Sequence, residues 1–479
     1  MSSKVKLTPG ESTVPYSTSH EHPTALVALG TALVLVTYVT PMATLPQTAA
    51  DLGAGAGARA WMLSSMSVGL AAGLLASGAL GDAVGRRRTY LVGLAAMGLG
   101  ALVCAFAPWT AVFVGARVLE GLGGAAILAC GLAILAHASP KAADRVRATG
   151  IWGASVGLGI TAGAILAAAL NVGTDWREAY LVIGFAALAL VLPSGRLVPE
   201  SSAEHARRLD LPGVLTLAAS LTLLVSGLTA ARSGLSPAAT ALLALSAVLL
   251  VVFSLVEMRS AQPMVDLGLL RSPGFLSATL GAMVLGIGII GMTSNVPTLV
   301  QIGLGGSLWV ATWLVVGWSA TSVLSSLLVR RVVIPLSGPD LIAAAMLVVG
   351  LGQLLALGIG SDSSAWLLMP SLVVSGLATG VLNAVLGREA VANVPPDRAA
   401  MGSGSNNTAR YLGAACGITV FSVVLSHSGT GAGAAKLVDG WSTAVLVASA
   451  ASVLGALGIA VIGRLPQHHV SQRRNNDSL

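Results

Sequence analysis

Charged residues are scarce in this sequence of 479 residues: Asp, Glu, Lys and Arg together make up only 9%. Soluble domains carry about 25% charged residues, so the composition excludes an ordinary soluble protein. Cysteine is almost absent as well, and the three cysteines lie far apart within apolar stretches, at Cys104, Cys130 and Cys416. Their odd number and wide spacing predict neither a disulfide nor a bound metal ion.

Recognisable catalytic and nucleotide-binding motifs are also missing. The sequence contains no G-x-x-x-x-G-K-[ST] segment, which argues against ATP-driven work within this chain. It contains no catalytic triad and no cluster of metal ligands, so we expect neither an enzyme nor a cofactor. The net charge of +7 comes from residues in short loops rather than from a basic domain, so we expect no nucleic-acid partner.

Long apolar stretches dominate the chain instead. Hydrophobic residues make up 55% of it, and its mean hydropathy is +0.84. Runs of about 20 apolar residues can cross a bilayer as helices, whereas barrel strands need only about 9–11 alternating residues. The sequence therefore predicts an all-α membrane protein with fourteen transmembrane helices, near 24–46, 60–80, 89–107, 110–137, 147–170, 178–195, 211–231, 236–257, 274–301, 307–329, 339–360, 365–387, 402–426 and 440–463.

The positions of the basic residues predict the orientation of these helices. If the N-terminus lies inside, most of the 26 Lys and Arg residues fall in inner segments. The outer loops then hold only Arg59, Arg177, Arg232 and Lys436. Because short inner loops are enriched in Lys and Arg, we expect a multi-pass protein of the cell inner (plasma) membrane. It would be embedded in the lipid bilayer with both termini in the cytoplasm.

The two longest inner segments, at about 196–210 and 258–273, divide the chain. Between them lie two predicted helices joined by a short Ser-Gly turn. We therefore expect two six-helix bundles plus an inserted two-helix hairpin, with a substrate site between the bundles near the midplane. The predicted parts are a cytoplasmic tail at 1–23, an N-terminal bundle at 24–195, a linker with two extra membrane helices at 196–272, a C-terminal bundle at 273–463 and a cytoplasmic tail at 464–479.

A basic loop follows the second predicted helix, with the sequence Gly78-Ala-Leu-Gly-Asp82-Ala-Val-Gly85-Arg86-Arg87-Arg88. Three arginines in a row cannot remain in hydrocarbon, and a glycine allows a sharp turn. The arginines can pair with Asp82, with carbonyls at a helix end or with lipid headgroups. The segment resembles the signature loop of the major facilitator superfamily, G-x-L-x-D-x-x-G-R-[RK]. This resemblance implies a conformational latch made of Gly78, Asp82, Gly85, Arg86 and Arg87.

The fourth predicted helix contains two charged residues. Counted from an outer start near Thr110, the helical rise places Arg117 about 10 Å and Glu120 about 15 Å deep. Residues three apart share a helix face and can pair, and charged groups at such depth usually face a cavity. The stretch resembles the superfamily motif R-x-x-[QE]-G, which implies that Arg117 and Glu120 couple transport to protons. A buried ion pair that only fixes helix packing is the alternative.

Closely spaced glycines mark the fifth predicted helix. The G-x-x-x-G spacing, which favours close helix packing, occurs twice, at Gly153/Gly157 and at Gly159/Gly163. The segment is similar to a drug/proton antiporter motif that ends in G-P-x-x-G-G. Here Ile160 and Ala164 replace the proline and the last glycine, so the motif is only partly present.

The first and sixth predicted helices match fourteen-span exporters unequally. Trp176 and Tyr180 resemble the W-R-x-x-F that opens helix 6, and we expect both rings at the membrane interface. Many such exporters carry an acidic residue in the middle of helix 1, where this sequence has Thr37. Glu120 is then the only carboxylate clearly within a span, and Asp51 is the next candidate for carrying a proton.

A polar segment interrupts a late apolar run. It reads Gly402-Ser-Gly404-Ser-Asn406-Asn407-Thr-Ala-Arg410-Tyr-Leu-Gly413-Ala-Ala-Cys416-Gly417 and resembles the family's G-x-x-x-N-x-x-R-x-x-G-x-x-x-G helix. The helical rise places Arg410 about 12 Å from the inner end. Arg410 can face the cavity, available to an anionic substrate or to Glu120, or hold a helix contact through backbone carbonyls. The predicted substrate cavity comprises Arg410, Asn407, Asn295, Trp313 and Asn383, with Thr293 and Trp318 as further candidates.

These resemblances span residues 24–463 and imply the fourteen-span drug/proton antiporter family. We therefore expect a secondary active transporter, working as a monomer, that exports a small amphipathic drug or antibiotic in exchange for protons. One alternative is a proton-coupled or exchange transporter of a metabolite, including an anionic one, which the two buried arginines and the missing acid on helix 1 favour. The other alternative is a non-transporting membrane receptor or scaffold, which would not need Glu120.

Overall fold

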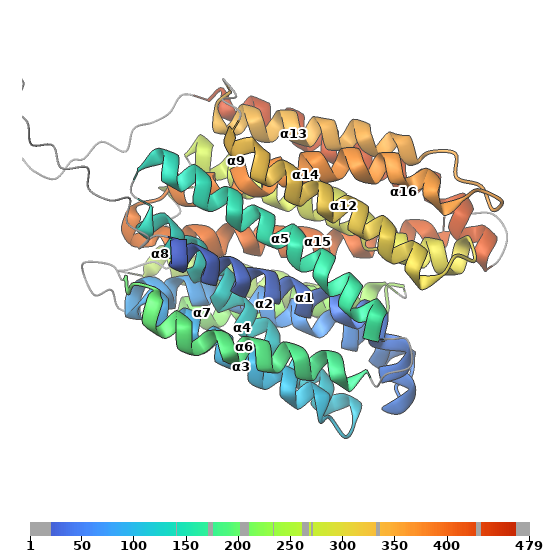
Figure 1. Ribbon diagram of the computed structural model, residues 1–479, viewed down its shortest axis with the longest axis horizontal. Coiled ribbons are helices and arrows are strands. Elements are labelled where there is room, and N and C mark those ends of the chain that lie inside the picture. The colour runs from blue at the N-terminus through green and yellow to red at the C-terminus, as the bar shows by residue number, and fades with distance from the viewer. Residues whose placement is uncertain are drawn as a thin grey trace, which may run out of the picture.

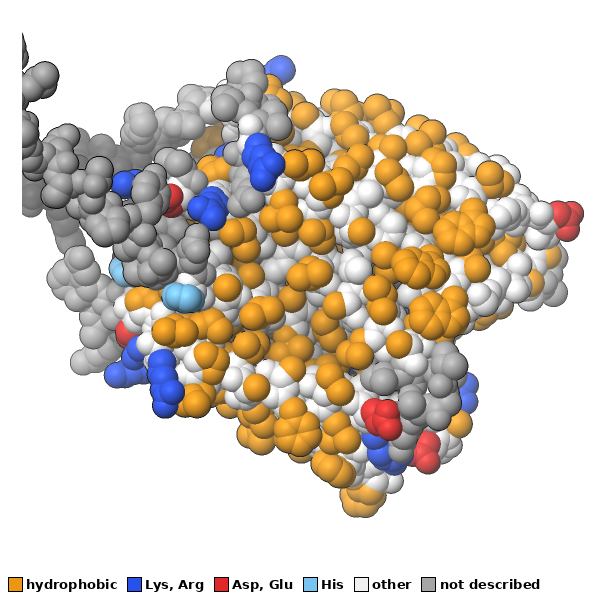
Figure 2. Space-filling view, in the orientation of Figure 1, with side chains coloured by type: hydrophobic (Ala, Val, Ile, Leu, Met, Phe, Trp, Pro, Cys, Tyr) orange, Lys and Arg blue, Asp and Glu red, His pale blue; other side chains and the backbone are white. Residues whose placement is uncertain are grey.

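The computed structural model of the protein describes residues 21–139, 141–170, 176–201, 210–232, 234–260, 268–269, 272–331, 336–427 and 433–465. Within these residues fourteen helical segments are long and apolar enough to cross a membrane, and there is no strand. The predicted number of spans and the all-α fold are therefore confirmed. Hydrophobic side chains cover the middle of the surface in Figure 2, and the charged side chains lie toward its two ends. Residues 1–20 and 466–479 of the predicted tails lie outside the described part, as do 202–209 and 261–267 of the predicted linker.

Six helices form the N-terminal group, drawn in blue to green in Figure 1: α1 (Glu21–Asp51), α2 (Ala56–Val84), α3 (Arg86–Ala105), α4 (Thr110–Ala138), α5 (Ala142–Leu170) and α6 (Arg177–Leu197). Small residues let these helices approach closely. At the contact of α2 with α4, a Cβ added to Gly69 would lie 2.9 Å from the Gly121 Cα atom. The abundance of glycine thus translates into direct contact between helix backbones.

Six further spans form the C-terminal group, drawn in yellow to red in Figure 1. The first span runs over 273–303 and alternates between α-helix and π-helix: α9 (Pro273–Val284), η3 (Leu285–Ile290), α10 (Gly291–Thr293), α11 (Val296–Thr298) and η4 (Leu299–Gly303). The others are α12 (Leu308–Leu328), α13 (Gly338–Gln353), α14 (Met369–Ala392), α15 (Ala399–His427) and α16 (Ala434–Gly463), with 3-10 turns at Val329–Arg331, Leu354–Ala356, Ala365–Leu368 and Pro396–Arg398. π-Helical turns often mark functional segments, and η3 borders the cavity described below.

The hairpin of α7 (Leu211–Ala231) and α8 (Pro237–Arg259) lies on one side of the bundle. Reciprocal hydrogen bonds join its helices, because Ser220 Oγ donates to the Ser246 carbonyl at 3.0 Å and Ser246 Oγ donates to the Ser220 carbonyl at 2.9 Å. Apolar residues of α7, including Leu217 and Leu221, pack on α2. The hairpin is therefore attached mainly through α7, and α8 turns much of its surface outward.

The rings of Trp176 and Tyr180 face other helices rather than the outside of the protein, so the prediction that they form an aromatic belt is wrong. Both are buried in the N-terminal group, where they and Phe113 pack edge to face with ring centroids 5.4–5.9 Å apart. The exposed tryptophans stand elsewhere, at Trp109, Trp309, Trp313 and Trp366. The sequence around Trp176 gave no sign that Phe113, on α4, would cover it.

Candidate functional site

The predicted basic loop at 78–88 is almost entirely helical, because α2 continues to Val84 and α3 begins at Arg86. Gly85 adopts a φ of 127°, which residues with side chains rarely adopt, and it joins the end of α2 directly to the start of α3. The amide of Gly85 donates to the Gly81 carbonyl at 3.0 Å. Because Gly85 alone separates the two helices, Asp82 near the end of α2 and Arg86 at the start of α3 lie side by side.

Asp82 joins the two helix groups. Its Oδ1 atom accepts hydrogen bonds from Arg86 Nε at 2.9 Å and from the Ala400 amide at 3.1 Å. Its Oδ2 atom accepts a hydrogen bond from the Met401 amide at 2.9 Å. These two amides belong to the first turn of α15, where the helix dipole also favours a negative charge. A buried carboxylate from the N-terminal group thus caps a helix of the C-terminal group.

The remaining latch residues act at two places. Arg86 Nη2 donates to the Pro396 carbonyl at 2.7 Å, and a Cβ added to Gly78 would lie 2.6 Å from the Ala400 carbonyl oxygen. Gly78 and Arg86 therefore belong to the contact with α15. Arg87 points away from it, because its guanidinium donates to the Val198 carbonyl at 3.3 Å and so ties the loop to the end of α6. We call the contact of Gly78, Asp82 and Arg86 with residues 396–401 the α2–α15 contact.

The glycines of α5 serve two different neighbours. A Cβ on Gly157 would lie 2.9 Å from the Ser319 carbonyl oxygen of α12, so Gly153 and Gly157 permit contact with the C-terminal group. Gly159 and Gly163 face α1 instead, where a Cβ on Gly163 would lie 2.9 Å from the Val36 Cα atom. Each G-x-x-x-G pair therefore lies at a close helix contact, one between the two groups and one within the N-terminal group.

Arg117 and Glu120 form the ion pair that their spacing predicts, and both side chains are fully buried. Arg117 Nη1 donates to Glu120 Oε2 at 2.6 Å and to the Thr37 carbonyl of α1 at 3.0 Å. The pair lies within the N-terminal group, with the Glu120 side chain against Gly100 of α3. Neither residue lines the cavity described next. The predicted pair is confirmed, but it has no direct access to that cavity in this conformation.

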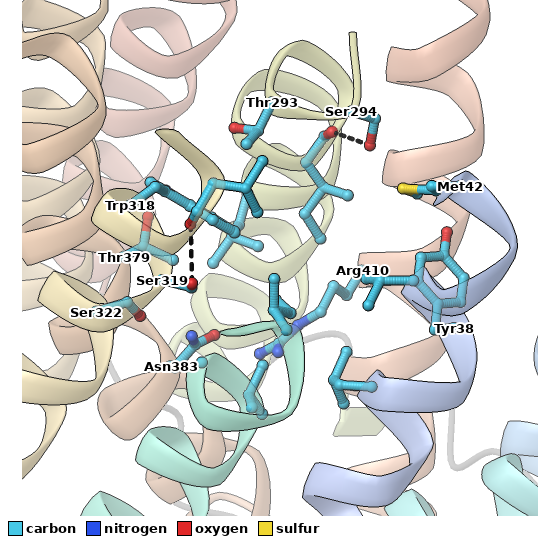
Figure 3. Close-up of a pocket in the computed structure, with 18 of the residues that line it drawn as sticks. Tyr38, Met42, Thr293, Ser294, Trp318, Ser319, Ser322, Thr379, Asn383 and Arg410 are labelled. Atoms are coloured by element: carbon cyan, nitrogen blue, oxygen red, sulfur yellow. Dashed lines mark hydrogen bonds between the residues drawn. The ribbon is translucent and has the colours of Figure 1, made fainter. Parts of the chain in front are cut away.

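A cavity of about 90 Å³ lies between the two groups (Figure 3). The N-terminal group contributes residues of α1 and α5, including Tyr38 and Met42, whereas the C-terminal group contributes residues of the 273–303 span, α12, α14 and α15. Pockets for drug-sized ligands usually measure about 300–1,000 Å³. The described conformation is thus constricted, and a larger ligand requires the groups to move apart.

Only some of the predicted cavity residues reach this space. Arg410 and Asn383 line it, and Figure 3 shows the guanidinium of Arg410 directed toward Asn383. Asn407 is buried and donates to the Ser403 carbonyl of its own helix, and Asn295 donates to the Gly291 carbonyl in the same way. Trp313 is 50% exposed on the outside of the bundle. The structure therefore brings together Arg410 and Asn383, but not the other three.

Several lining residues were not singled out from the sequence. Ser319, Ser322 and Thr379 line the cavity in addition to the two further candidates, Thr293 and Trp318, which are confirmed as lining residues. Tyr38 and Tyr411 meet across it with ring centroids 5.8 Å apart. The spacing of Trp318, Ser319 and Ser322 places them on one helix face, and this was the available signal in α12.

Comparisons with known proteins agree with this architecture. A family model described as Major Facilitator Superfamily matches residues 27–418. The chain is 30% identical over 385 residues to the multidrug resistance protein Stp of Mycobacterium tuberculosis, covering 80% of this chain and 71% of Stp. It is 30% identical over 403 residues to the multidrug efflux pump LfrA of Mycolicibacterium smegmatis, covering 84% and 80%.

Solved structures show the same fold. The structure of the human organic anion transporter MFSD10 superimposes with a TM-score of 0.69 over 92% of this chain and 100% of that one. The two sequences are only 18% identical, so this likeness concerns the arrangement of helices alone.

Proposed function

The chain belongs to the major facilitator superfamily, and from that premise we propose that it exports small amphipathic drugs or antibiotics across the membrane that it spans. The observation that carries the proposal is the cavity between two helix groups that are also joined by the α2–α15 contact. Breaking such a contact on one side and forming another on the opposite side would expose the cavity alternately to the two faces.

The orientation of the latch gives this motion a direction. We place the protein in the plasma membrane with both termini in the cytoplasm, which puts the Asp82 loop on the cytoplasmic face. The α2–α15 contact then closes the cytoplasmic side in the described conformation. Because one chain supplies both helix groups, a monomer is sufficient for this cycle. The division into six, two and six spans supports rocking of two six-helix bundles about the cavity, with the hairpin attached to one side.

We further propose that protons drive export through Glu120. Burial favours the neutral form of a carboxyl group, whereas the neighbouring Arg117 favours the charged form. Protonation of Glu120 would weaken its bond to Arg117, whose other bond reaches the Thr37 carbonyl. The next residue along α1 is Tyr38, which lines the cavity. A proton on Glu120 can therefore act on the substrate site through α1 without entering the cavity.

Asp51 is a poorer proton carrier. Hydrogen bonds from Arg177 and Trp176 hold the pKa of Asp51 below its usual value, so this carboxylate stays charged near neutral pH. Arg177 Nη2 lies 2.7 Å from Asp51 Oδ2, and Trp176 Nε1 donates to the same oxygen at 3.2 Å. The pair fastens the end of α1 to the start of α6, which is a structural role.

Transport in inside-out vesicles tests the proposal. A panel of cationic, neutral and anionic amphipathic compounds, chosen by their toxicity to cells with and without the protein, would be offered with an imposed pH gradient. We expect at least one compound to accumulate in the vesicles. This accumulation should disappear when an ionophore collapses the pH gradient. Absence of accumulation for every compound would contradict export, and accumulation that ignores the gradient would contradict proton coupling.

The variant Glu120→Gln tests the proton site separately. Glutamine keeps the shape of the side chain but cannot titrate, so we expect uphill accumulation to disappear while substrate binding persists and loses its pH dependence. Asp51→Asn is the matched control, and it should retain accumulation driven by the gradient. If Glu120→Gln still concentrates the substrate, the proton is carried elsewhere.

A further inference from the structure

Three arginines are buried in the described part of the chain, and one of them differs from the others. Arg86, Arg117 and Arg410 have relative exposures of 2%, 0% and 4%. Arg86 is paired with Asp82 at 2.8 Å, and Arg117 is paired with Glu120 at 2.6 Å. Arg410 has no carboxylate partner among the described residues.

The surroundings of Arg410 leave its charge uncompensated. Its Nε and Nη2 atoms are buried and have no hydrogen-bond partner in the described part of the chain. Its guanidinium carbon lies 5.9 Å from the centre of the Trp152 ring, a contact that offsets only part of the cost of burial. Among the described residues that line the cavity, Arg410 is the only charged one. A buried cation without a counter-charge is costly, and an anion in the cavity would offset that cost.

The rest of the lining suits an apolar molecular body. Leu35, Val156, Leu285 and Ile290 surround the cavity, and a few hydroxyl groups stand among them. The Tyr38 and Tyr411 rings add flat surfaces beside Arg410. One cationic end and apolar walls together match a molecule with a single acidic group and a hydrophobic or aromatic skeleton.

We propose that the cavity selects amphipathic anions, namely aromatic or polycyclic carboxylates or sulfonates, whose acid group binds the guanidinium of Arg410. This inference rests on the proposed function only in taking the cavity as the substrate site. A guanidinium can hold both oxygens of a carboxylate through parallel hydrogen bonds. A cationic compound of the same shape is repelled by Arg410 and finds no acidic partner in the described lining.

Binding of three matched probes to the purified protein in nanodiscs of phosphatidylcholine tests this selectivity. The probes are 1-pyrenebutyrate, its methyl ester and an analogue with a trimethylammonium group in place of the carboxylate. Energy transfer from tryptophan to pyrene reports binding, and the signal of empty nanodiscs is subtracted. We expect the carboxylate to bind at least about tenfold more tightly than the ester, and the cation to bind most weakly.

Variants at Arg410 connect the preference to this side chain. In Arg410→Gln the carboxylate should bind no better than the ester, while in Arg410→Lys part of the preference should remain. Arg59→Gln, which removes an exposed arginine, is the control and should leave the preference unchanged. Equal binding of the carboxylate and the ester to the unmodified protein would overturn the proposal, and so would an unchanged preference in Arg410→Gln. If Arg410→Gln does not fold, the preference for the carboxylate over the ester is still tested by the unmodified protein and by Arg410→Lys.

Two further arms separate the sources of an anion and the two proposals. If phosphatidylglycerol nanodiscs raise the melting temperature of the unmodified protein but not of Arg410→Lys, and pyrenebutyrate does not bind, the occupant is a lipid headgroup and the proposal is wrong. Export of cationic but not anionic compounds by vesicles would leave the export function standing and refute the anion site. Anion binding without export of any compound would support the anion site and contradict the export function.

Discussion

Two of the contacts between the helix groups differ in their chemistry. The α2–α15 contact is ionic, because the Asp82 carboxylate accepts hydrogen bonds from two amides of α15 and from the guanidinium of Arg86. The α5–α12 contact is made of small and hydroxyl residues: Ser326 Oγ donates to the Gly150 carbonyl at 3.0 Å, and Thr161 and Ser319 share a hydrogen bond of 2.7 Å. One contact depends on a charge and the other on close packing.

The difference is notable because α2 and α12 are the second spans of their groups. The end of α2 carries Asp82 and Arg86, whereas the end of α12 leads into Arg330 and Arg331 without an acidic residue. Of these two second spans, only α2 therefore carries a carboxylate near its end. The ionic contact can be switched by a single group, and the packed contact can act as the pivot about which the groups turn.

Asp82→Asn should have the largest effect, because it strikes the ionic contact. The amide keeps the size of the side chain but leaves Arg86 buried without a counter-charge, and removing one partner of a buried pair costs about 3–5 kcal/mol. We expect transport in vesicles to be nearly abolished while the protein remains abundant in the membrane. Asp362→Asn, at an exposed position, is the control. Normal transport by Asp82→Asn would show that the ionic contact is dispensable.

Gly153→Val should have an intermediate effect, because it strikes the packed contact. A Cβ at this position would lie 2.5 Å from Ser326 Oγ and 3.0 Å from the Ala384 amide nitrogen. Overpacking of this kind costs about 1–3 kcal/mol. We expect a lower melting temperature and slower transport.

Gly115→Val is the matched control for Gly153→Val, since a Cβ at Gly115 meets no atom within 4 Å. Equal melting temperatures for these two variants would mean that α5 and α12 do not need their close approach.

Ser326→Ala should have the smallest effect, because it removes one neutral hydrogen bond from the packed contact. Such a bond contributes about 1 kcal/mol, so the transport rate should change by less than about tenfold. Ser254→Ala, at an exposed position on α8, is the control. A loss as severe as that of Asp82→Asn would contradict the division of the two contacts into ionic and packed.

Hydropathy and spacing were enough to predict the framework. Apolar runs gave the fourteen spans, and the i, i+3 spacing of Arg117 and Glu120 gave their ion pair. The orientation of side chains in uniformly apolar helices was harder. In α12 the surface that faces the cavity carries Ser319 and Ser322 but also the large apolar ring of Trp318, so hydropathy alone did not distinguish this tryptophan from the exposed Trp313.

Contacts between side chains from distant segments could not be predicted from the sequence either. That Arg410 has no counter-charge depends on which residues α5, α12 and α14 bring to it. Burial of Trp176 depends on Phe113, which lies more than sixty positions earlier in the chain. Both results come from tertiary packing, which local patterns do not encode.

The capping of α15 by a single carboxylate also bears on how fast the two helix groups can separate. The amides of Ala400 and Met401 are neighbours on one rigid helix end, and both reach the same side chain. Movement of α15 away from α2 therefore stretches both of these hydrogen bonds, together with the bond from Arg86 to the Pro396 carbonyl. The cost of breaking these bonds adds to the barrier of that movement, and each 1.4 kcal/mol of barrier slows a step about tenfold. A stronger contact at this position would thus lengthen the time that the protein needs to open this side.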